Sequence, residues 1–82
     1  MRFKILLFAA LRERMGVEAV EIELEPGSRV ADLRRGLSER FPTLGPLLSR
    51  CAIAVAEEFA DDETVLRPEE VVALIPPVSG GQ

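Results

Sequence analysis

The chain has 82 residues, of which 48% are hydrophobic and 29% are charged, and its formal net charge is −4. This length suits a single domain, and the composition is that of a folded domain rather than a disordered chain. Because phosphate binding needs a basic surface, the acidic balance argues against nucleic acid as a partner and favours a basic face on another protein. A chain this short buries a modest fraction of its surface, so we expect it to depend on partners.

The sequence contains no histidine and one cysteine, Cys51. It therefore lacks the commonest general base and metal ligand, and we expect no internal disulfide, no metal and no bound cofactor. No apolar run reaches the about 18 residues that span a bilayer. The opening MRFKILLFAA has the positive start of a signal peptide, but charges follow its short apolar part at once. We interpret it as a strand and expect a cytoplasmic protein without membrane contact.

The first elements are two strands and a turn. RFKILLFAA is apolar on both faces from Ile5 to Phe8, which indicates a strand buried on both sides. LRERMG is typical of a helical turn that ends at Gly16. AVEIEL alternates apolar and acidic residues, which predicts a half-exposed strand at a sheet edge.

A longer helix follows the turn EPGS. Ser28 is the predicted N-cap and Asp32 lies near the first turn. Pro42 ends the helix. The apolar residues at helical spacing, which we expect to face the core, are Val30, Leu33, Leu37 and Phe41.

The second half predicts two more strands. TLGPLLSR reads as a connector with apolar anchors, CAIAVA as a strand, EEFADDET as a turn or short ribbon, and VLRPEE as another turn. VVALI is apolar on both faces and is therefore predicted to be a central strand. This order predicts an α+β domain over residues 1–75. With the first and last strands side by side, one main helix would cover a mixed sheet, which is the β-grasp, or ubiquitin-like, fold.

Residues 76–82 form a predicted flexible tail. Pro76 and Pro77 forbid continuation of the strand and favour a stiff, extended departure. Val78 is a lone apolar residue, and the two glycines near the end have no Cβ atoms, so the tail suits a narrow channel. At full extension, Pro76 to Gly81 reaches about 20 Å. From composition alone, the simpler interpretation is a frayed end without a function.

Two segments change that interpretation: ILLFAALRERMG and LRPEEVVALIPPVSGG. They resemble the opening strand and turn, and the closing strand, double proline and diglycine, of the small subunit of molybdopterin synthase, the MoaD family of sulfur carriers. The similarity runs nearly end to end. The thiamine-pathway sulfur carriers share the fold and the diglycine but usually lack the double proline. The resemblance implies a β-grasp subunit of a sulfurtransferase that performs no catalysis by itself.

The chemistry implied by the resemblance takes place at the tail. A partner related to ubiquitin-activating enzymes uses ATP to adenylate the terminal glycine, which then receives sulfur and becomes a thiocarboxylate. The tail enters the large synthase subunit, where the sulfur passes to a cyclic pyranopterin precursor in molybdenum cofactor biosynthesis. Carried over, Gly81 would hold the thiocarboxylate and Gly80 would allow passage. The expected assembly is a heterotetramer of two small and two large subunits.

The resemblance also implies an apolar docking patch near the root of the tail. The residues at matching positions are Phe8, Phe59 and Ile75, and Pro76 and Val78 would join them. For Phe8 and Ile75, packing in the core is an equal alternative. Phe59 stands among acids in EEFADD, which favours exposure.

Two positions depart from the family's pattern. Many relatives have asparagine where this chain has Ala56, so we expect an altered turn or a missing hydrogen bond there. Gln82 follows the diglycine, whereas the family's chemistry needs a terminal glycine. Either a peptidase removes Gln82, or it is foreign to the natural chain, or the chain cannot be activated.

Some assignments stay open. Arg12 matches a commonly basic position and is either a partner contact or a solvated charge. The acidic residues between 57 and 63 favour a solvated turn over a metal site. For Cys51, a small buried residue is favoured over a role as a sulfur relay. The rival functions are a ubiquitin-like modifier joined to lysines through Gly81, a carrier for thiamine synthesis or tRNA thiolation, and a non-reactive interaction domain.

Overall fold

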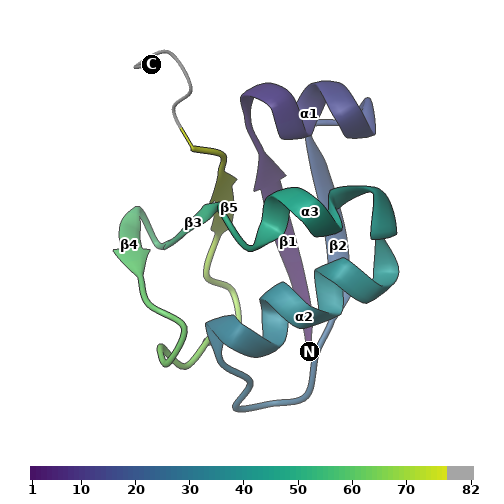
Figure 1. Cartoon of the computed structure of the whole chain (residues 1–82). Helices are drawn as coiled ribbons and strands as arrows, with labels where there is room; N and C mark the ends of the chain where they lie inside the picture. The colour runs from purple at the N-terminus through teal and green to yellow at the C-terminus, as the bar shows by residue number, and fades with distance from the viewer. Residues whose placement is uncertain (78–82) are drawn as a thin grey trace.

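The computed structural model describes residues 1–77 and shows a mixed sheet with helices in front of it (Figure 1). The strands are β1 (Arg2–Leu7), β2 (Ala19–Glu23), β3 (Ala52–Val55), β4 (Glu58–Ala60) and β5 (Val72–Ile75), in the spatial order β2-β1-β5-β3-β4. β1 and β5 pair in parallel at the centre, and all other neighbours are antiparallel. The expected β-grasp arrangement is confirmed, with β2 at one edge.

One main helix covers the sheet, as expected. α2 (Val30–Arg40) buries Val30, Leu33 and Leu37 against it. α1 (Ala9–Met15) ends at Gly16, whose φ of 73° is the left-handed conformation that glycine adopts freely. The segment expected to be a connector contains a 3₁₀ turn, η1 (Pro42–Leu44), and a short helix, α3 (Gly45–Leu48). None of the helices within residues 1–77 has the length and apolar character needed to cross a membrane.

The start of α2 differs from the prediction. Arg29, not Ser28, is the N-cap residue, and its backbone N–H donates to Oδ2 of Asp32 at 2.9 Å. The Ser28 hydroxyl instead donates to the carbonyl of Glu25 at 2.7 Å, within the preceding turn. The Ser28 side chain therefore belongs to the turn before α2 rather than to the N-cap of the helix.

The prediction that β1 is buried on both sides was wrong. Ile5 and Leu7 are buried beneath the helices, whereas Leu6 is half-buried and Phe8 is 43% exposed. The apolar run correctly marked a central strand, but the helices within residues 1–77 cover one face of the sheet, so the second face stays open. The open face is therefore an apolar surface rather than core.

The turn between β3 and β4 is strained. Its two central residues, Ala56 and Glu57, have φ values of 51° and 71°. Two consecutive positive φ angles match a type I′ hairpin turn, which favours Asn-Gly because other residues pay a steric cost in this conformation. Ala56, where the resemblance leads us to expect asparagine, thus occupies a position with a left-handed backbone.

Arg34 ties three segments together, which the sequence analysis did not foresee. Its guanidinium donates to the carbonyls of Leu48 and Cys51, the latter at 2.9 Å, and to the carboxylate of Asp62 at 3.1 Å. The side chain is only 21% exposed. Arg34 therefore satisfies carbonyls at and just after the end of α3 and anchors the loop that follows β4.

The double substitution Ala56→Asn, Glu57→Gly should raise the free energy of unfolding by about 1 kcal/mol, because both new residues accept positive φ. Urea denaturation followed by circular dichroism measures this. The control is Glu58→Gly, one residue later in β4, which should lower stability because the backbone there needs no such freedom. An unchanged or lower midpoint for the double variant would contradict the strain at this turn.

Arg34→Ala should lower the free energy of unfolding by about 2 kcal/mol, because it leaves buried carbonyls without a charged donor. Arg35→Ala is the matched control, since within residues 1–77 the exposed Arg35 side chain forms a salt bridge only to Asp32, at 2.6 Å, and it should cost at most about 0.5 kcal/mol. Equal losses of unfolding free energy in the two variants would show that the Arg34 contacts stabilise the fold no more than an exposed salt bridge does.

Candidate functional site

The candidate site is the open face of the sheet, opposite α2. Residues in register across neighbouring strands share a face. Leu6 of β1 pairs with Ala73 of β5, Ala73 pairs with Ala54 of β3, and Ala54 pairs with Phe59 of β4. A row of apolar side chains therefore crosses four strands on the side that no described helix covers.

The root of the tail lies at one end of this face. Because β1 and β5 are parallel, their last residues reach the same edge of the sheet. Phe8 directly follows β1, and Pro76 directly follows β5. The chain therefore leaves the sheet beside an exposed aromatic ring.

The predicted patch residues fall as follows. Phe59 is 75% exposed, Phe8 is 43% exposed, and Ile75 and Pro76 are half-buried. Neither Phe8 nor Ile75 belongs to the buried core cluster, so the core-packing alternative does not describe them. Val78, Gly80 and Gly81 lie outside the described residues. The structure places the described members of the patch on the open face or at the edge where the tail begins.

A groove runs along this face. Its volume is about 620 Å³. Apart from acidic residues at one end, its lining is apolar and comprises Leu6, Phe8, Ala54, Ala56, Val71 and Ala73. The alanines and Val71 were not among the site residues predicted from the sequence. The available signal was the spacing of two between Ala54 and Ala56 and between Val71 and Ala73, at the adjoining ends of β3 and β5.

The groove's acidic end consists of Glu57, Glu69 and Glu70. None of these carboxylates forms a salt bridge with a residue between 1 and 77. The acids of the loop after β4 differ, because Asp62 and Glu63 form salt bridges to Arg34 and Arg29 of 3.1 and 2.6 Å.

The acidic stretch does not assemble a metal site in the described part of the chain. No group of three potential ligands occurs within residues 1–77. Asp61 instead accepts hydrogen bonds from the backbone of Glu63 and the hydroxyl of Thr64, at 3.0 and 3.2 Å. These contacts shape the loop, as expected for a turn.

A larger cavity, of about 1130 Å³, lies between β2 and α2, away from the root of the tail. Several of its charges are already paired, because Arg2 forms salt bridges to Glu21 and Glu23. The hydrogen bond and charge of the Met1 amino group hold the pKa of the Glu23 carboxyl below its ordinary value. The backbone N–H of Arg29 likewise lowers the pKa of Asp32. These pairs stabilise the fold locally.

Cys51 lies just before β3 and is buried, as expected. Burial raises the pKa of its thiol, and the nearby Arg34 charge only partly opposes this effect. A buried thiol with a raised pKa is a poor nucleophile at neutral pH. This environment fits a packing role.

The comparisons with known proteins agree with this geometry. A model of the ThiS family matches residues 5–81. The chain is 35% identical to the molybdopterin synthase sulfur carrier subunit of Chlamydomonas reinhardtii, covering 99% of this chain and 100% of that protein. It is 33% identical to the subunit of the same name from Mycobacterium tuberculosis, covering 98% of each.

Solved structures of related proteins share this fold. SAMP1 from Haloferax volcanii superposes with a TM-score of 0.83 and 27% identity, over 99% of this chain and 100% of that one. A chain in the complex of subunits 1 and 2 of the molybdopterin-converting factor from Helicobacter pylori has a TM-score of 0.72 and 30% identity, over 99% and 100%. With a family match over nearly its whole length and a ubiquitin-like sheet, the chain belongs to the ThiS/MoaD family.

Proposed function

We propose that this protein is the sulfur-carrier subunit of a molybdopterin synthase and donates sulfur from a thiocarboxylate on Gly81 to a cyclic pyranopterin precursor. The observation that carries the proposal is the apolar open face, which ends where the chain leaves the sheet towards the diglycine. Full-length relatives that are named as sulfur carrier subunits of this synthase support it.

The chemistry begins with a carboxylate, which is a poor electrophile. The activating partner joins it to AMP from ATP, releasing pyrophosphate, and a sulfur nucleophile then displaces AMP to leave the thiocarboxylate. Glycine suits this step because it has no side chain to hinder the carbonyl. The Gly81 carboxylate requires cleavage of the bond to Gln82, so the proposal includes a processing peptidase.

The folded domain contributes by holding the tail at a partner's catalytic centre. We propose that Phe8, Phe59 and Ile75, with Pro76 and Val78, bind the large subunit and, in a separate complex, the ATP-dependent adenylyltransferase. Exposed aromatic side chains are typical anchors of protein interfaces. Docking then converts sulfur delivery into an effectively intramolecular step.

The large subunit is the partner with the clearest support, because a related chain occurs in a complex of subunits 1 and 2 of the molybdopterin-converting factor. We propose a heterotetramer of two small and two large subunits, acting in the cytoplasm. The large subunit supplies the catalytic groups.

The second candidate is a ubiquitin-like modifier. Similarity to the small archaeal modifier protein 1 of Haloferax volcanii, with 25% identity and a TM-score of 0.80, favours it. Activation is the same, but the acceptor is a lysine amine of another protein. Isopeptide-linked adducts in cells would support the modifier, and their absence together with sulfur transfer would support the carrier.

The intact mass of the chain, recovered from its native cells without reducing or hydrolysing conditions, tests the proposal. We expect a chain that ends at Gly81 with one oxygen replaced by sulfur. Deletion of residues 80–82 should abolish molybdopterin synthesis in a reconstituted system and leave thermal stability unchanged. A chain that always retains Gln82, or a deletion variant with full activity, would favour the non-reactive interaction domain.

Phe59→Ala should weaken binding to the large subunit by roughly tenfold, because an aromatic side chain that becomes buried in an interface typically contributes more than about 1 kcal/mol. Val65→Ala is the matched control, since Val65 is 47% exposed but bridges to Arg29 at the start of α2. Calorimetric titration measures both affinities. An unchanged affinity for Phe59→Ala would remove Phe59 from the interface.

A further inference from the structure

The floor of the groove on the open face is made of alanines. Ala54 and Ala73 are directly paired across β3 and β5, and Ala56 continues the floor. Larger side chains, Leu6, Phe8 and Val71, line the groove around them. Small residues in register at the middle of an apolar face leave a depression that can take a side chain from another molecule.

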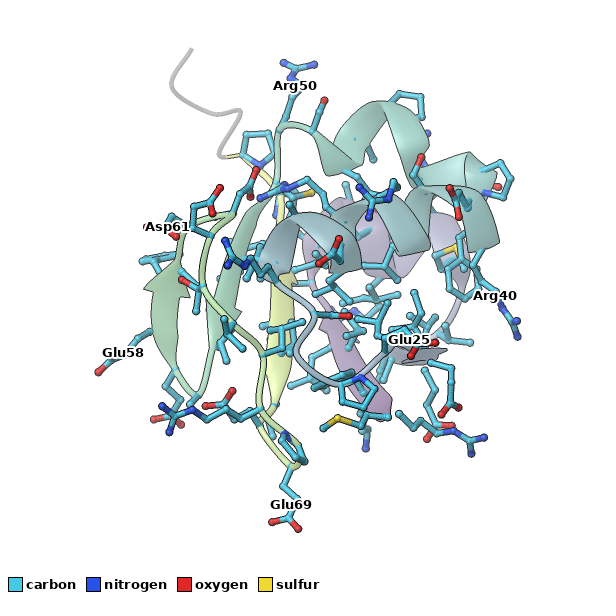
Figure 2. The ribbon with its side chains drawn as sticks, turned by 90° about the horizontal axis from the view of Figure 1, so that it is seen from below. Glu25, Arg40, Arg50, Glu58, Asp61 and Glu69 are labelled. Carbon is cyan, nitrogen blue, oxygen red and sulfur yellow. The ribbon has the colours of Figure 1, made fainter. Side chains whose placement is uncertain are left out.

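The two ends of the groove differ in charge. Glu57 and Glu69 form no salt bridge with any residue between 1 and 77, and Glu70 accepts a hydrogen bond from the backbone N–H of Arg67 at 3.0 Å. The cations nearby in register or sequence, Lys4 and Arg67, neither line the groove nor form salt bridges within the described chain. In Figure 2, Glu69 projects from the molecule on the side away from the helices.

The acidic end and the root of the tail lie at opposite ends of β5. The N–H of Ala56 bonds to the carbonyl of Val71, just before β5 begins. Ile75, where β5 ends, pairs with Ala52 at the start of β3. Val71 and Ile75 are four residues apart, so the rise of a strand separates them by roughly 13 Å.

We propose that the groove binds a long basic side chain, arginine or lysine, of the large synthase subunit. Its aliphatic stem lies over Ala54 and Ala73, and its charged head meets Glu57 and Glu69. Long cationic side chains bury their stems on apolar surfaces in this way. A purely apolar occupant would desolvate the carboxylates without a partner, which is unfavourable. This inference rests on the proposed function.

Binding of a basic side chain in the groove would fix the orientation of the partner on the open face. An apolar face alone allows a partner to dock in more than one direction. A cation held at the acidic end selects the direction in which the partner's channel lies at the other end, near Pro76. The groove thereby positions the tail, while the chemistry stays with the tail and the partner.

Two sets of variants test the groove, with the large subunit of the same organism as the probe. Ala73→Leu fills the floor and Ala73→Ser keeps it open. Glu57→Lys and Glu69→Lys reverse the acidic end, whereas Glu39→Lys makes the same change on α2, outside the groove. Biolayer interferometry gives association rates and affinities at salt concentrations from about 0.05 to 0.5 M, a range over which the screening length falls severalfold.

We expect Ala73→Leu and each groove charge reversal to weaken binding by roughly tenfold at low salt, with Ala73→Ser and Glu39→Lys close to wild type. The wild-type association rate should fall with salt, and the reversals should flatten that dependence. Thermal melts establish that each variant is folded. If Ala73→Leu fails to fold, the binding affinities of the charge-reversal variants alone test whether the groove binds a basic side chain.

Three results would overturn the groove's assignment: reversals that bind like Glu39→Lys, a salt-independent association rate, or a homodimer of the carrier that Ala73→Leu dissociates. The last result would make a second copy the occupant. Thiocarboxylate formation is measured separately on the wild type. If no thiocarboxylate forms but binding still depends on the groove, the sulfur-carrier function is rejected and the groove remains a binding site for a basic side chain.

Discussion

The parallel pairing of β1 with β5 is the constraint on which the rest of this structure depends. It joins the first and last strands at the centre of the sheet, so both strands end at the same edge. Phe8 and Pro76 follow those ends directly, which places an exposed aromatic ring beside the departing chain. Antiparallel pairing would send Phe8 to the opposite edge and separate the docking surface from the tail.

The second constraint is that the helices within residues 1–77 cover only one face of the sheet. α2 buries its apolar stripe on one face of the sheet, and no helix within residues 1–77 covers the other face. The open face nevertheless keeps apolar residues in register across β1, β5, β3 and β4. A contiguous apolar surface that a folded protein leaves uncovered is typical of a binding site. The same feature that limits the core thus provides the surface for a partner.

The charges divide into two groups. The arginines of α2 and its N-cap bind the loop after β4, through Arg34 with Asp62 and Arg29 with Glu63. The glutamates at the β3–β4 turn and before β5 have no such partners among residues 1–77. The first group stabilises the fold, and the second is available to another molecule. Two residues of the second group, Glu57 and Glu69, have positive φ, as do Ala9, which follows Phe8, and Ala56, which lines the groove. Backbone strain of this kind gathers at binding sites.

Hydrophobic periodicity identified the main strands and the long helix, but not η1 and α3, which lie in the segment predicted to be a connector. The alternation in AVEIEL identified an edge strand, the helical spacing from Val30 identified α2, and the apolar runs at both ends of the domain identified central strands. The end-to-end resemblance, carried by the double proline and the diglycine, determined the family. The N-cap was predicted one residue too early: Ser28 bonds within its own turn, and the backbone N–H of Arg29 donates to Asp32 at the start of the helix.

Only the tertiary structure decided which apolar residues are core and which are surface. Leu6 and Leu7 are identical in chemistry and adjacent in sequence, yet Leu7 is buried and Leu6 lines a groove. Likewise, Ala54, Ala73 and Glu69 are unremarkable until strand pairing brings them to one groove. Periodicity records which side of a strand is apolar, but burial depends on whether another layer covers that side, and that is a property of the whole fold.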